Sequence, residues 1–244
     1  MKTNRTYCVP DIHGRLDLLH KLWAKLVDDE NLDLNQDKVV FLGDMIDRGP
    51  DSYGVVEFIR ELTLLHPTNV IALAGNHDWM LIMAKTRGSY DDWSMWSNNG
   101  GKATMDSYNK VGFDDVLAEH IKWLANLPFK YELPGYFLSH APAPSEGHRN
   151  ILNKGLPEFT PDELTWSYHK DEWGLARHHK NGVIGVSGHI HQLSKGIMEP
   201  RFYDHHFYLD CGCGCSDKAP LVAVEINTKK VIYAWPNETV YYIE

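Results

Sequence analysis

The sequence predicts an α/β fold in which a single domain contains two β-sheets. In the first third of the chain, short apolar runs alternate with amphipathic helical segments, a pattern typical of a mainly parallel sheet. Further strand-like runs separated by turns follow from Tyr136 onward and indicate a second sheet. The chain has 244 residues, enough for one large domain or two small ones. Because no repeat or low-complexity linker divides it, we expect one domain over residues 1–244.

The first five expected elements alternate between strand and helix. In order, they are a strand at Arg5–Val9, a helix at Leu16–Val27, a strand at Lys38–Leu42, a helix at Asp51–Leu65 and a strand at Asn69–Ala74. Both helices carry apolar residues at helical spacing, and Pro67 follows the second one, where proline prevents the helix from continuing. This order implies right-handed crossovers between neighbouring parallel strands.

The middle of the chain, residues 78–130, is expected to be mainly helical, with breaks at Gly100-Gly101 and at Gly112. We interpret it as a cap or insertion that extends to residue 135. Beyond it, the expected strands are Tyr136–Ser139, Val183–Ser187, His206–Leu209, Leu221–Ile226 and Val231–Trp235. Because turns separate these runs, we expect the second sheet to be more antiparallel than the first.

The composition excludes several classes of protein. A net charge of −9 argues against broad binding of nucleic acid by phosphate neutralisation. The longest apolar runs, Val39–Leu42 and Val70–Ala74, are too short to cross a bilayer, and the N-terminus lacks the apolar segment of a secretory signal. We therefore expect a cytoplasmic protein with no membrane partner. Nothing in the sequence indicates its oligomeric state.

Three of the four cysteines lie in the run Cys211-Gly212-Cys213-Gly214-Cys215. They are too close together to form a disulfide framework between distant segments. We interpret the run as a glycine-rich turn with reduced thiols. The alternative, a soft-metal site, usually has ligands spaced as Cys-x-x-Cys pairs.

Five short polar segments each follow an expected strand. They are Asp11-Ile12-His13-Gly14, Gly43-Asp44-Met45-Ile46-Asp47-Arg48-Gly49, Gly75-Asn76-His77-Asp78, Ser139-His140-Ala141 and Gly188-His189-Ile190-His191. In open α/β sheets, ligand sites form at the carboxyl ends of the strands, so these Asp, His and Asn residues are expected to converge. Any one segment could be an ordinary turn, and the argument depends on all five together.

The residue types in these segments point to metal ions. Carboxylate, imidazole and amide oxygen together suit Mn, Fe or Zn better than Ca or Mg, which prefer oxygen alone. Six or seven such ligands exceed the number that one tetrahedral ion takes. Two ions about 3.5–4 Å apart that share one carboxylate would use them all.

In this order, the segments DIHG, GDMIDRGPDS, GNHD, SHA and GHIH resemble those of the calcineurin-like metallophosphoesterases. The second segment is most similar to the phosphoprotein phosphatase branch, which includes bacterial and phage Ser/Thr phosphatases and symmetrical diadenosine tetraphosphatases. The resemblance runs from residue 5 to residue 226. It implies a four-layer α/β/β/α fold, in which two mixed sheets pack as a sandwich between helices.

The resemblance also implies the ligands of two divalent ions, for which we expect Mn, with Fe, Zn, Ni or Co as alternatives. The first ion takes Asp11 and His13, the second takes Asn76, His140 and His189, Asp44 bridges both, and His191 is a further ligand of the first.

The same resemblance implies three catalytic roles. His77 is the general acid beside the leaving group, Asp47 orients it, and Arg48 binds phosphate. Arg48, Asn76 and His77 are the residues expected to touch substrate. Relatives often carry a phosphate-clamping arginine where this chain has Tyr168, and His169, Lys170 or Arg177 are candidates to replace it.

The function implied is that of a two-metal-dependent phosphomonoesterase that attacks phosphate esters with metal-activated hydroxide. We expect a Ser/Thr phosphoprotein substrate, with phosphotyrosine as an additional one. The alternative is a nucleotide hydrolase acting on a dinucleoside polyphosphate or a 2′,3′-cyclic nucleotide. A third hypothesis, an inactive metal-binding interaction module, is disfavoured because His77, Asp47 and Arg48 are all retained.

Overall fold

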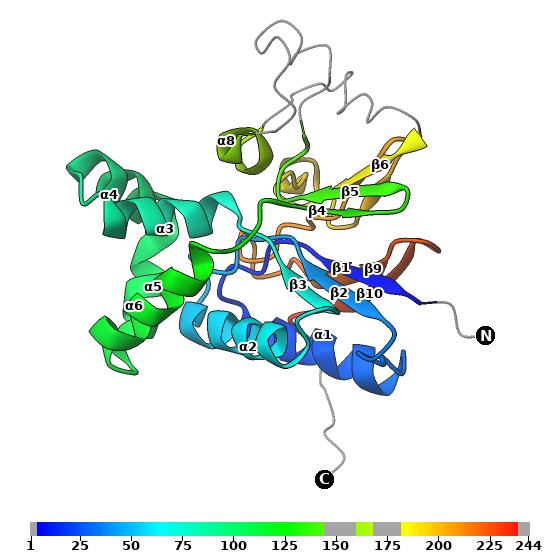
Figure 1. Ribbon diagram of the computed structural model, residues 1–244, viewed down its shortest axis with the longest axis horizontal. Coiled ribbons are helices and arrows are strands. Elements are labelled where there is room, and N and C mark those ends of the chain that lie inside the picture. The colour runs from blue at the N-terminus through cyan, green and yellow to red at the C-terminus, as the bar shows by residue number, and fades with distance from the viewer. Residues whose placement is uncertain (1–3, 144–159, 168–181, 239–244) are drawn as a thin grey trace, which may run out of the picture.

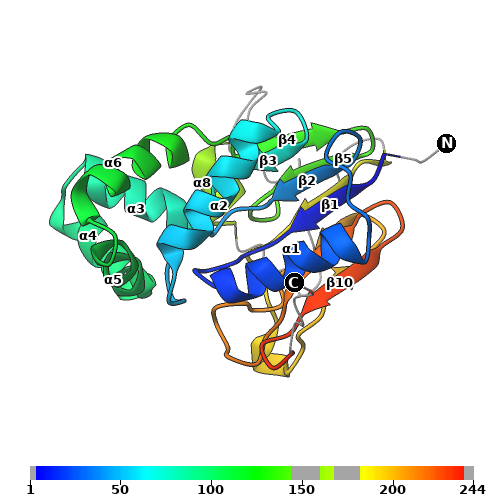
Figure 2. The same cartoon turned by 90° about the horizontal axis from the view of Figure 1, so that it is seen from below.

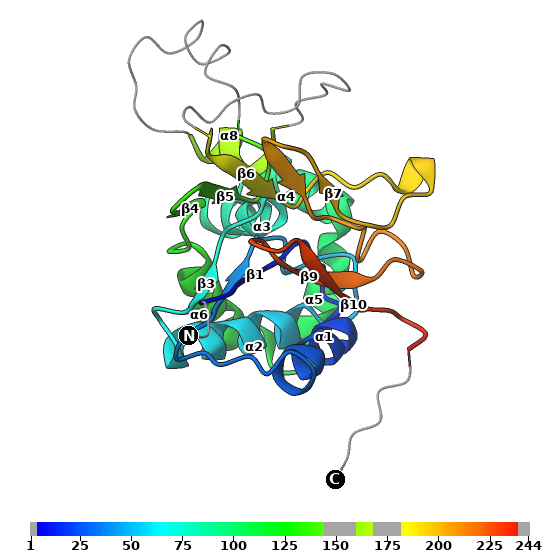
Figure 3. The ribbon, with the colours of Figure 1, turned by 90° about the vertical axis from the view of Figure 1, so that its right-hand side faces the viewer.

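The computed structural model describes residues 4–143, 160–167 and 182–238, which form two five-stranded sheets packed face to face (Figure 1). Helices α1 and α2, at Leu16–Asp28 and Ser52–Leu65, cover the outer face of the first sheet, as the view from below shows (Figure 2). A short helix, α8 at Pro161–Thr165, lies over the second sheet (Figure 3). The expected sandwich of two mixed sheets flanked by helices is confirmed.

The first sheet has the strand order β10-β9-β1-β2-β3. Its strands are β1 (Thr6–Val9), β2 (Lys38–Phe41), β3 (Val70–Ala72), β9 (Leu221–Glu225) and β10 (Lys230–Ala234). β1 pairs with β2 and β2 with β3, both in parallel, and the helices α1 and α2 connect these strands, as the sequence predicts. The alternation of side chains along a strand places Val39 and Phe41 against these helices and Val40 against the second sheet.

The second sheet has the order β4-β5-β6-β8-β7. Its strands are β4 (Lys130–Leu133), β5 (Tyr136–Ser139), β6 (Ile184–Ser187), β7 (Arg201–Phe202) and β8 (His206–Tyr208). The expectation of a more antiparallel second sheet is wrong, because each sheet contains two parallel and two antiparallel strand pairs.

The assignment of the last two expected strands to the second sheet is also wrong. β9 and β10 form a hairpin that joins the first sheet beside β1. Every residue of β9 is buried, with Val222 and Val224 facing the second sheet and Leu221 and Ala223 facing the helices. A strand that is apolar on both faces needs cover on both faces, and a place next to β1 provides it.

The helical middle segment lies at one end of the sandwich (Figures 1 and 2). It contains α3 (Asn76–Thr86), α4 (Tyr90–Trp96), a π-helical turn (Ser97–Gly101), α5 (Lys102–Asn109) and α6 (Phe113–Leu124). Its helical character is as predicted. Within the described parts of the chain, no helix is both long and apolar enough to cross a bilayer.

Replacing Leu22 by Ala tests the packing of α1 on the first sheet. Leu22 is 1% exposed within the core cluster, so the lost contacts and the cavity should cost about 2–5 kcal/mol of unfolding free energy, measured by urea denaturation. Leu65→Ala is the matched control, because Leu65 is 73% exposed, and it should change the stability by about 0.5 kcal/mol or less. Equal losses in the two variants would contradict this packing.

Candidate metal centre

The five polar segments meet where the carboxyl ends of β1, β2, β3, β5 and β6 come together. Across this junction, the backbone N–H of His189 donates to Asp11 Oδ1 (2.9 Å), which ties the loop after β6 to the loop after β1. The Nε2 atoms of His13 and His140 lie 3.6 and 3.4 Å from Asp44 Oδ2. Side chains from both sheets therefore surround a single carboxylate.

Asp44 belongs to two groups of potential ligands. One group joins it to His13 and His77, and the other joins it to His140 and His189, with the ligand atoms of each group within 4.8 Å of one another. Asp44 is 1% exposed, and burial raises the pKa of its carboxyl well above the usual value, with the nearby Asp11 adding to the effect. A buried carboxylate shared by two such groups favours positive charge on either side of it.

The two central histidines are held in the tautomer that metal binding requires. His13 Nδ1 donates to the carbonyl oxygen of Ile46 (2.8 Å), and His140 Nδ1 donates to that of Leu42 (3.0 Å). Since a carbonyl oxygen only accepts, both Nε2 atoms carry lone pairs. That of His140 lies near Asp44, and that of His13 accepts from Arg48 Nη1 at 2.6 Å. A histidine fixed through its other nitrogen to a backbone carbonyl is typical of metal ligands.

The pair His140 and Asn76 supplies the clearest indication of a cation. His140 Nε2 lies 2.8 Å from Asn76 Oδ1, so a lone pair faces an amide oxygen. A second proton on the imidazole could bridge these atoms, but burial lowers the pKa of His140. Two acceptors this close are stable together when a cation lies between them, and these residues therefore fit a divalent metal ion.

Beside these groups, Asp47, His77 and Arg48 form a chain of contacts. His77 Nδ1 donates to Asp47 Oδ2 (2.7 Å), and Arg48 Nη2 donates to His77 Nε2 (2.9 Å). Burial raises the pKa of Asp47 to about 7; burial and the positive Arg48 lower that of His77 to about 3. The imidazole is therefore neutral, with its single proton on the side of Asp47.

The other oxygen of Asp47 is held by two residues of the helical segment. Trp96 Nε1 donates to Asp47 Oδ1 at 3.0 Å, and Thr104 Oγ1 donates to the same atom at 2.7 Å. Neither contact was predicted from the sequence. They fix the carboxylate plane that orients His77.

Asp78 also escaped sequence reasoning, although it ends the segment Gly75-Asn76-His77-Asp78. Its carboxylate accepts the backbone N–H groups of Asp44, Met45 and Gly75 at 2.9, 3.2 and 2.9 Å. Asp44 has a left-handed backbone with φ 52°, which costs energy in a non-glycine residue. The three hydrogen bonds hold the loop in this strained shape.

The cysteine run packs against the same site. It forms a turn after β8, and all four cysteines are free thiols, in agreement with the sequence interpretation. Gly214 lies so close to His13 that a Cβ there would overlap the Cβ of His13. Arg48 Nη1 also donates to Cys215 Sγ (2.8 Å), a contact that no spacing rule in the sequence could have shown.

His191, like Asp11, is in neither group of ligand atoms, and four other predicted residues lie outside the described part of the chain. His191 is half-buried, and its Nδ1 accepts the backbone N–H of Leu193 at 3.4 Å. Tyr168, where relatives carry an arginine, and the candidate substitutes His169, Lys170 and Arg177 lie outside the described residues.

Two mixed sheets with buried Asp, His and Asn side chains at their common edge define the class of metallophosphoesterases. The fold is similar to that of a solved protein Ser/Thr phosphatase from Saccharomyces cerevisiae, with a TM-score of 0.65 over 99% of this chain and 82% of that one, at 15% identity. A model of the calcineurin-like phosphoesterases matches residues 5–193. The chain belongs to this family.

Curated relatives fall into two kinds. Serine/threonine-protein phosphatase 1 of Salmonella typhimurium is 26% identical over 147 residues, which cover 59% of this chain and 61% of the relative. The symmetrical bis(5′-nucleosyl)-tetraphosphatase of Aromatoleum aromaticum is 27% identical over 135 residues, which cover 55% of this chain and 43% of the relative. The chain thus spans less than two thirds of the length of these relatives.

Replacing Gly75 by Ala tests the close packing around Asp44. Gly75 has φ −95°, so alanine strains no dihedral angle there, but its Cβ would overlap the Oδ1 and backbone nitrogen of Asp44. We expect the affinity for Mn²⁺, measured by calorimetry, to fall about 10–100-fold. In the control Gly112→Ala, the Cβ meets no atom within 4 Å and φ is +94°, so stability should fall while Mn²⁺ affinity is kept. Equal metal affinity in both variants would contradict the assigned role of Asp44.

Proposed function

We propose that this protein is a two-metal-dependent phosphomonoesterase. One observation carries the proposal: the buried Asp44 carboxylate is shared by two groups of ligand atoms, beside an arginine and a carboxylate-bound histidine. Hydrolysis of a phosphate ester requires a group that binds phosphate and a group that carries a proton. Two cations bridged by a carboxylate, placed beside these groups, can activate the attacking water.

The proposed ligands follow from this arrangement. Asp44 would bridge two ions, one held by Asp11 and His13 and the other by Asn76, His140 and His189. The hydrogen bonds to Ile46 and Leu42 support His13 and His140 as ligands. The group of Asp44, His140 and His189 supports the second set, and Asp11 Oδ2 lies 3.9 Å from His13 Nε2. His191 remains a proposed additional ligand of the first ion.

When bound, the two ions would supply Lewis-acid stabilisation and a water molecule of lowered pKa for attack on phosphorus. The protein's own groups would then bind the phosphate charge and supply the proton for the leaving oxygen. Arg48 now donates to His77 Nε2, and an anionic phosphate would compete for its guanidinium. Once Arg48 turns to the phosphate, His77 Nε2 would be free to take a proton from the solvent, because a nearby anion favours the imidazolium form. His77 could then protonate the departing oxygen while Asp47 keeps its hold on Nδ1.

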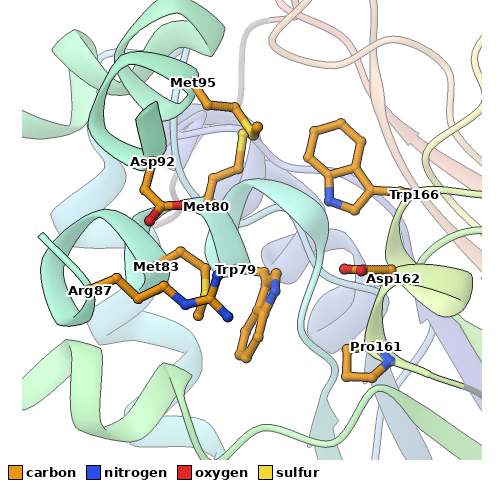
Figure 4. Close-up of a pocket in the computed structure, with 9 residues that line it drawn as sticks. All are labelled: Trp79, Met80, Met83, Arg87, Asp92, Met95, Pro161, Asp162 and Trp166. Carbon is orange, nitrogen blue, oxygen red and sulfur yellow. The ribbon is translucent and has the colours of Figure 1, made fainter. Parts of the chain in front are cut away.

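For the substrate, we propose a Ser/Thr phosphoprotein, and phosphotyrosine as an additional one. The proposal is supported by the relative named serine/threonine-protein phosphatase 1. A second candidate is a nucleotide such as a dinucleoside polyphosphate. It is favoured by a cavity between α3, α4 and α8 that is lined by tryptophan and methionine side chains (Figure 4). Manganese as the native metal and a cytoplasmic location are also part of this proposal.

Hydrolysis of an aryl phosphate tests the activity directly. The purified protein should release phosphate with added Mn²⁺, lose activity when the ions are removed by a chelator, and regain it when Mn²⁺ is restored, since the proposed water activation depends on bound metal. The rate of product release is the measurement. Inactivity with each of Mn²⁺, Fe²⁺, Zn²⁺, Ni²⁺ and Co²⁺ would refute the proposal.

Replacing His77 by Asn tests its assignment as proton donor rather than ligand, because His77 also lies in one of the two ligand groups. Turnover should fall about 10²–10⁴-fold on alkyl phosphates, less on aryl phosphates with good leaving groups, and the bound Mn²⁺ should be unchanged. Steady-state kinetics measures the turnover, and metal analysis measures the Mn²⁺ bound per chain. His20→Asn, an exposed histidine on α1, is the matched control. Loss of one Mn²⁺ per chain would show that His77 is a ligand.

A further inference from the structure

The turn that contains the cysteine run is fastened to the loop after β1. Cys213 is buried, and its Sγ donates to the carbonyl oxygen of Ile12 at 3.5 Å. The next residue, Gly214, has φ +74° and lies so close to His13 that no Cβ fits there. The backbone N–H of Cys215 closes the turn with a hydrogen bond of 3.0 Å to the carbonyl oxygen three residues earlier. These contacts fix the position of the Cys215 thiol beside the cluster around Asp44.

Arg48 is held at both ends by other parts of the chain. Its backbone has φ 68°, a left-handed conformation that costs energy in a residue other than glycine, and its N–H donates to the Gly100 carbonyl oxygen at 3.3 Å. At the guanidinium, Nη1 donates to Cys215 Sγ at 2.8 Å and to His13 Nε2 at 2.6 Å. Nη2 donates to His77 Nε2 at 2.9 Å. Because a free arginine side chain has many rotamers, contacts that fix it before a phosphate arrives lower the entropic cost of binding.

Cys215 differs from the two histidines in having no other task in the proposed chemistry. His13 is a proposed ligand of the first ion, and His77 Nε2 must lose its contact with Arg48 before it can carry a proton. Cys215 belongs to neither group of ligand atoms around Asp44. The contact between Nη1 and Cys215 can therefore persist while the contacts with both histidines are given up.

A thiol suits this position because it can orient a cation without neutralising it. Its sulfur is a weak hydrogen-bond acceptor and is uncharged while the thiol keeps its proton. Partial desolvation raises the pKa of the Cys215 thiol to about 12, although the nearby Arg48 acts in the opposite direction. A carboxylate here would instead form an ion pair with the guanidinium and compete with an anionic phosphate.

We infer that Cys215 is a positioning residue for Arg48: its thiol holds Nη1 in place while Nη2 turns from His77 to the substrate phosphate. The inference rests on the proposed phosphoesterase function, in which Arg48 binds the phosphate. It gives the cysteine run a task at the site that needs no metal and no disulfide.

Binding of inorganic phosphate to the Mn²⁺-loaded full chain tests this role. Cys215→Ala removes the acceptor, so we expect the dissociation constant of phosphate, measured by calorimetry, to rise about 3–10-fold. Cys215→Ser supplies a hydroxyl oxygen that also accepts, and it should recover part of the loss. In aryl phosphate hydrolysis, KM should rise by a similar factor and kcat should change less, because Arg48 binds the phosphate before as well as during the reaction.

A double-mutant cycle with Arg48→Ala separates this role from a direct contact between Cys215 and phosphate. If the thiol acts through Arg48, Cys215→Ala should have no further effect on phosphate binding once Arg48 is replaced. Ser216→Ala is the matched control in the same turn. The Ser216 hydroxyl accepts the backbone N–H of Lys218 at 3.2 Å, and this variant should bind phosphate like the original protein.

An unchanged phosphate affinity in Cys215→Ala would overturn the inference, and so would an equal loss with and without Arg48. A parallel fall in Mn²⁺ affinity or in urea stability would also overturn it, because Cys215 would then only support the turn. Absence of saturable phosphate binding by the original protein would do the same. Failure of the hydrolase proposal is distinguishable, since it appears as absent aryl phosphate hydrolysis by a chain that still binds phosphate.

Discussion

The rest of the structure depends on the burial of the Asp44 carboxylate among neutral imidazoles. Burial makes a negative charge costly and keeps His13 and His140 unprotonated, so the histidines cannot neutralise it themselves. Such a cluster is stable when cations complete it. The loop holds the carboxylate in this position through three backbone N–H groups that donate to Asp78 and stabilise the strained backbone of Asp44.

The two-sheet architecture follows from the same requirement. One parallel sheet could bring the loops after β1, β2 and β3 to a common edge, but His140 and His189 come from β5 and β6 of the other sheet. Packing the sheets face to face through Val40, Leu138, Val186 and Val224 aligns their carboxyl ends. The apolar layer between the sheets thus fixes the separation of polar groups that lie far apart in the sequence.

Sequence reasoning reached the elements and the convergence of the polar segments because both are local: periodicity marks a strand or helix, and a polar turn after a strand marks an edge. It failed where a strand's position or a side chain's role depends on residues far away in the sequence. The apolar run of β9 fits either sheet equally well, and only pairing with β1 decides. Trp96, Thr104 and Cys215 act through one or two hydrogen bonds to Asp47 or Arg48 across the fold, and such contacts leave no spacing pattern in the chain.

The protein divides its chemistry between two kinds of scaffold. Most of the cluster around Asp44 follows strand ends, whose pairing within the sheets keeps the ligand atoms in place, whereas Asn76 and His77 begin α3. The cavity beside it is carried by helices α3, α4 and α8, which pack through side chains and tolerate changes in length and sequence more easily. Since the hydrogen bonds from Trp96 to Asp47 and from Ala141 to α8 connect the two parts, a change in the packing of these helices would also reach Asp47 and the backbone beside His140.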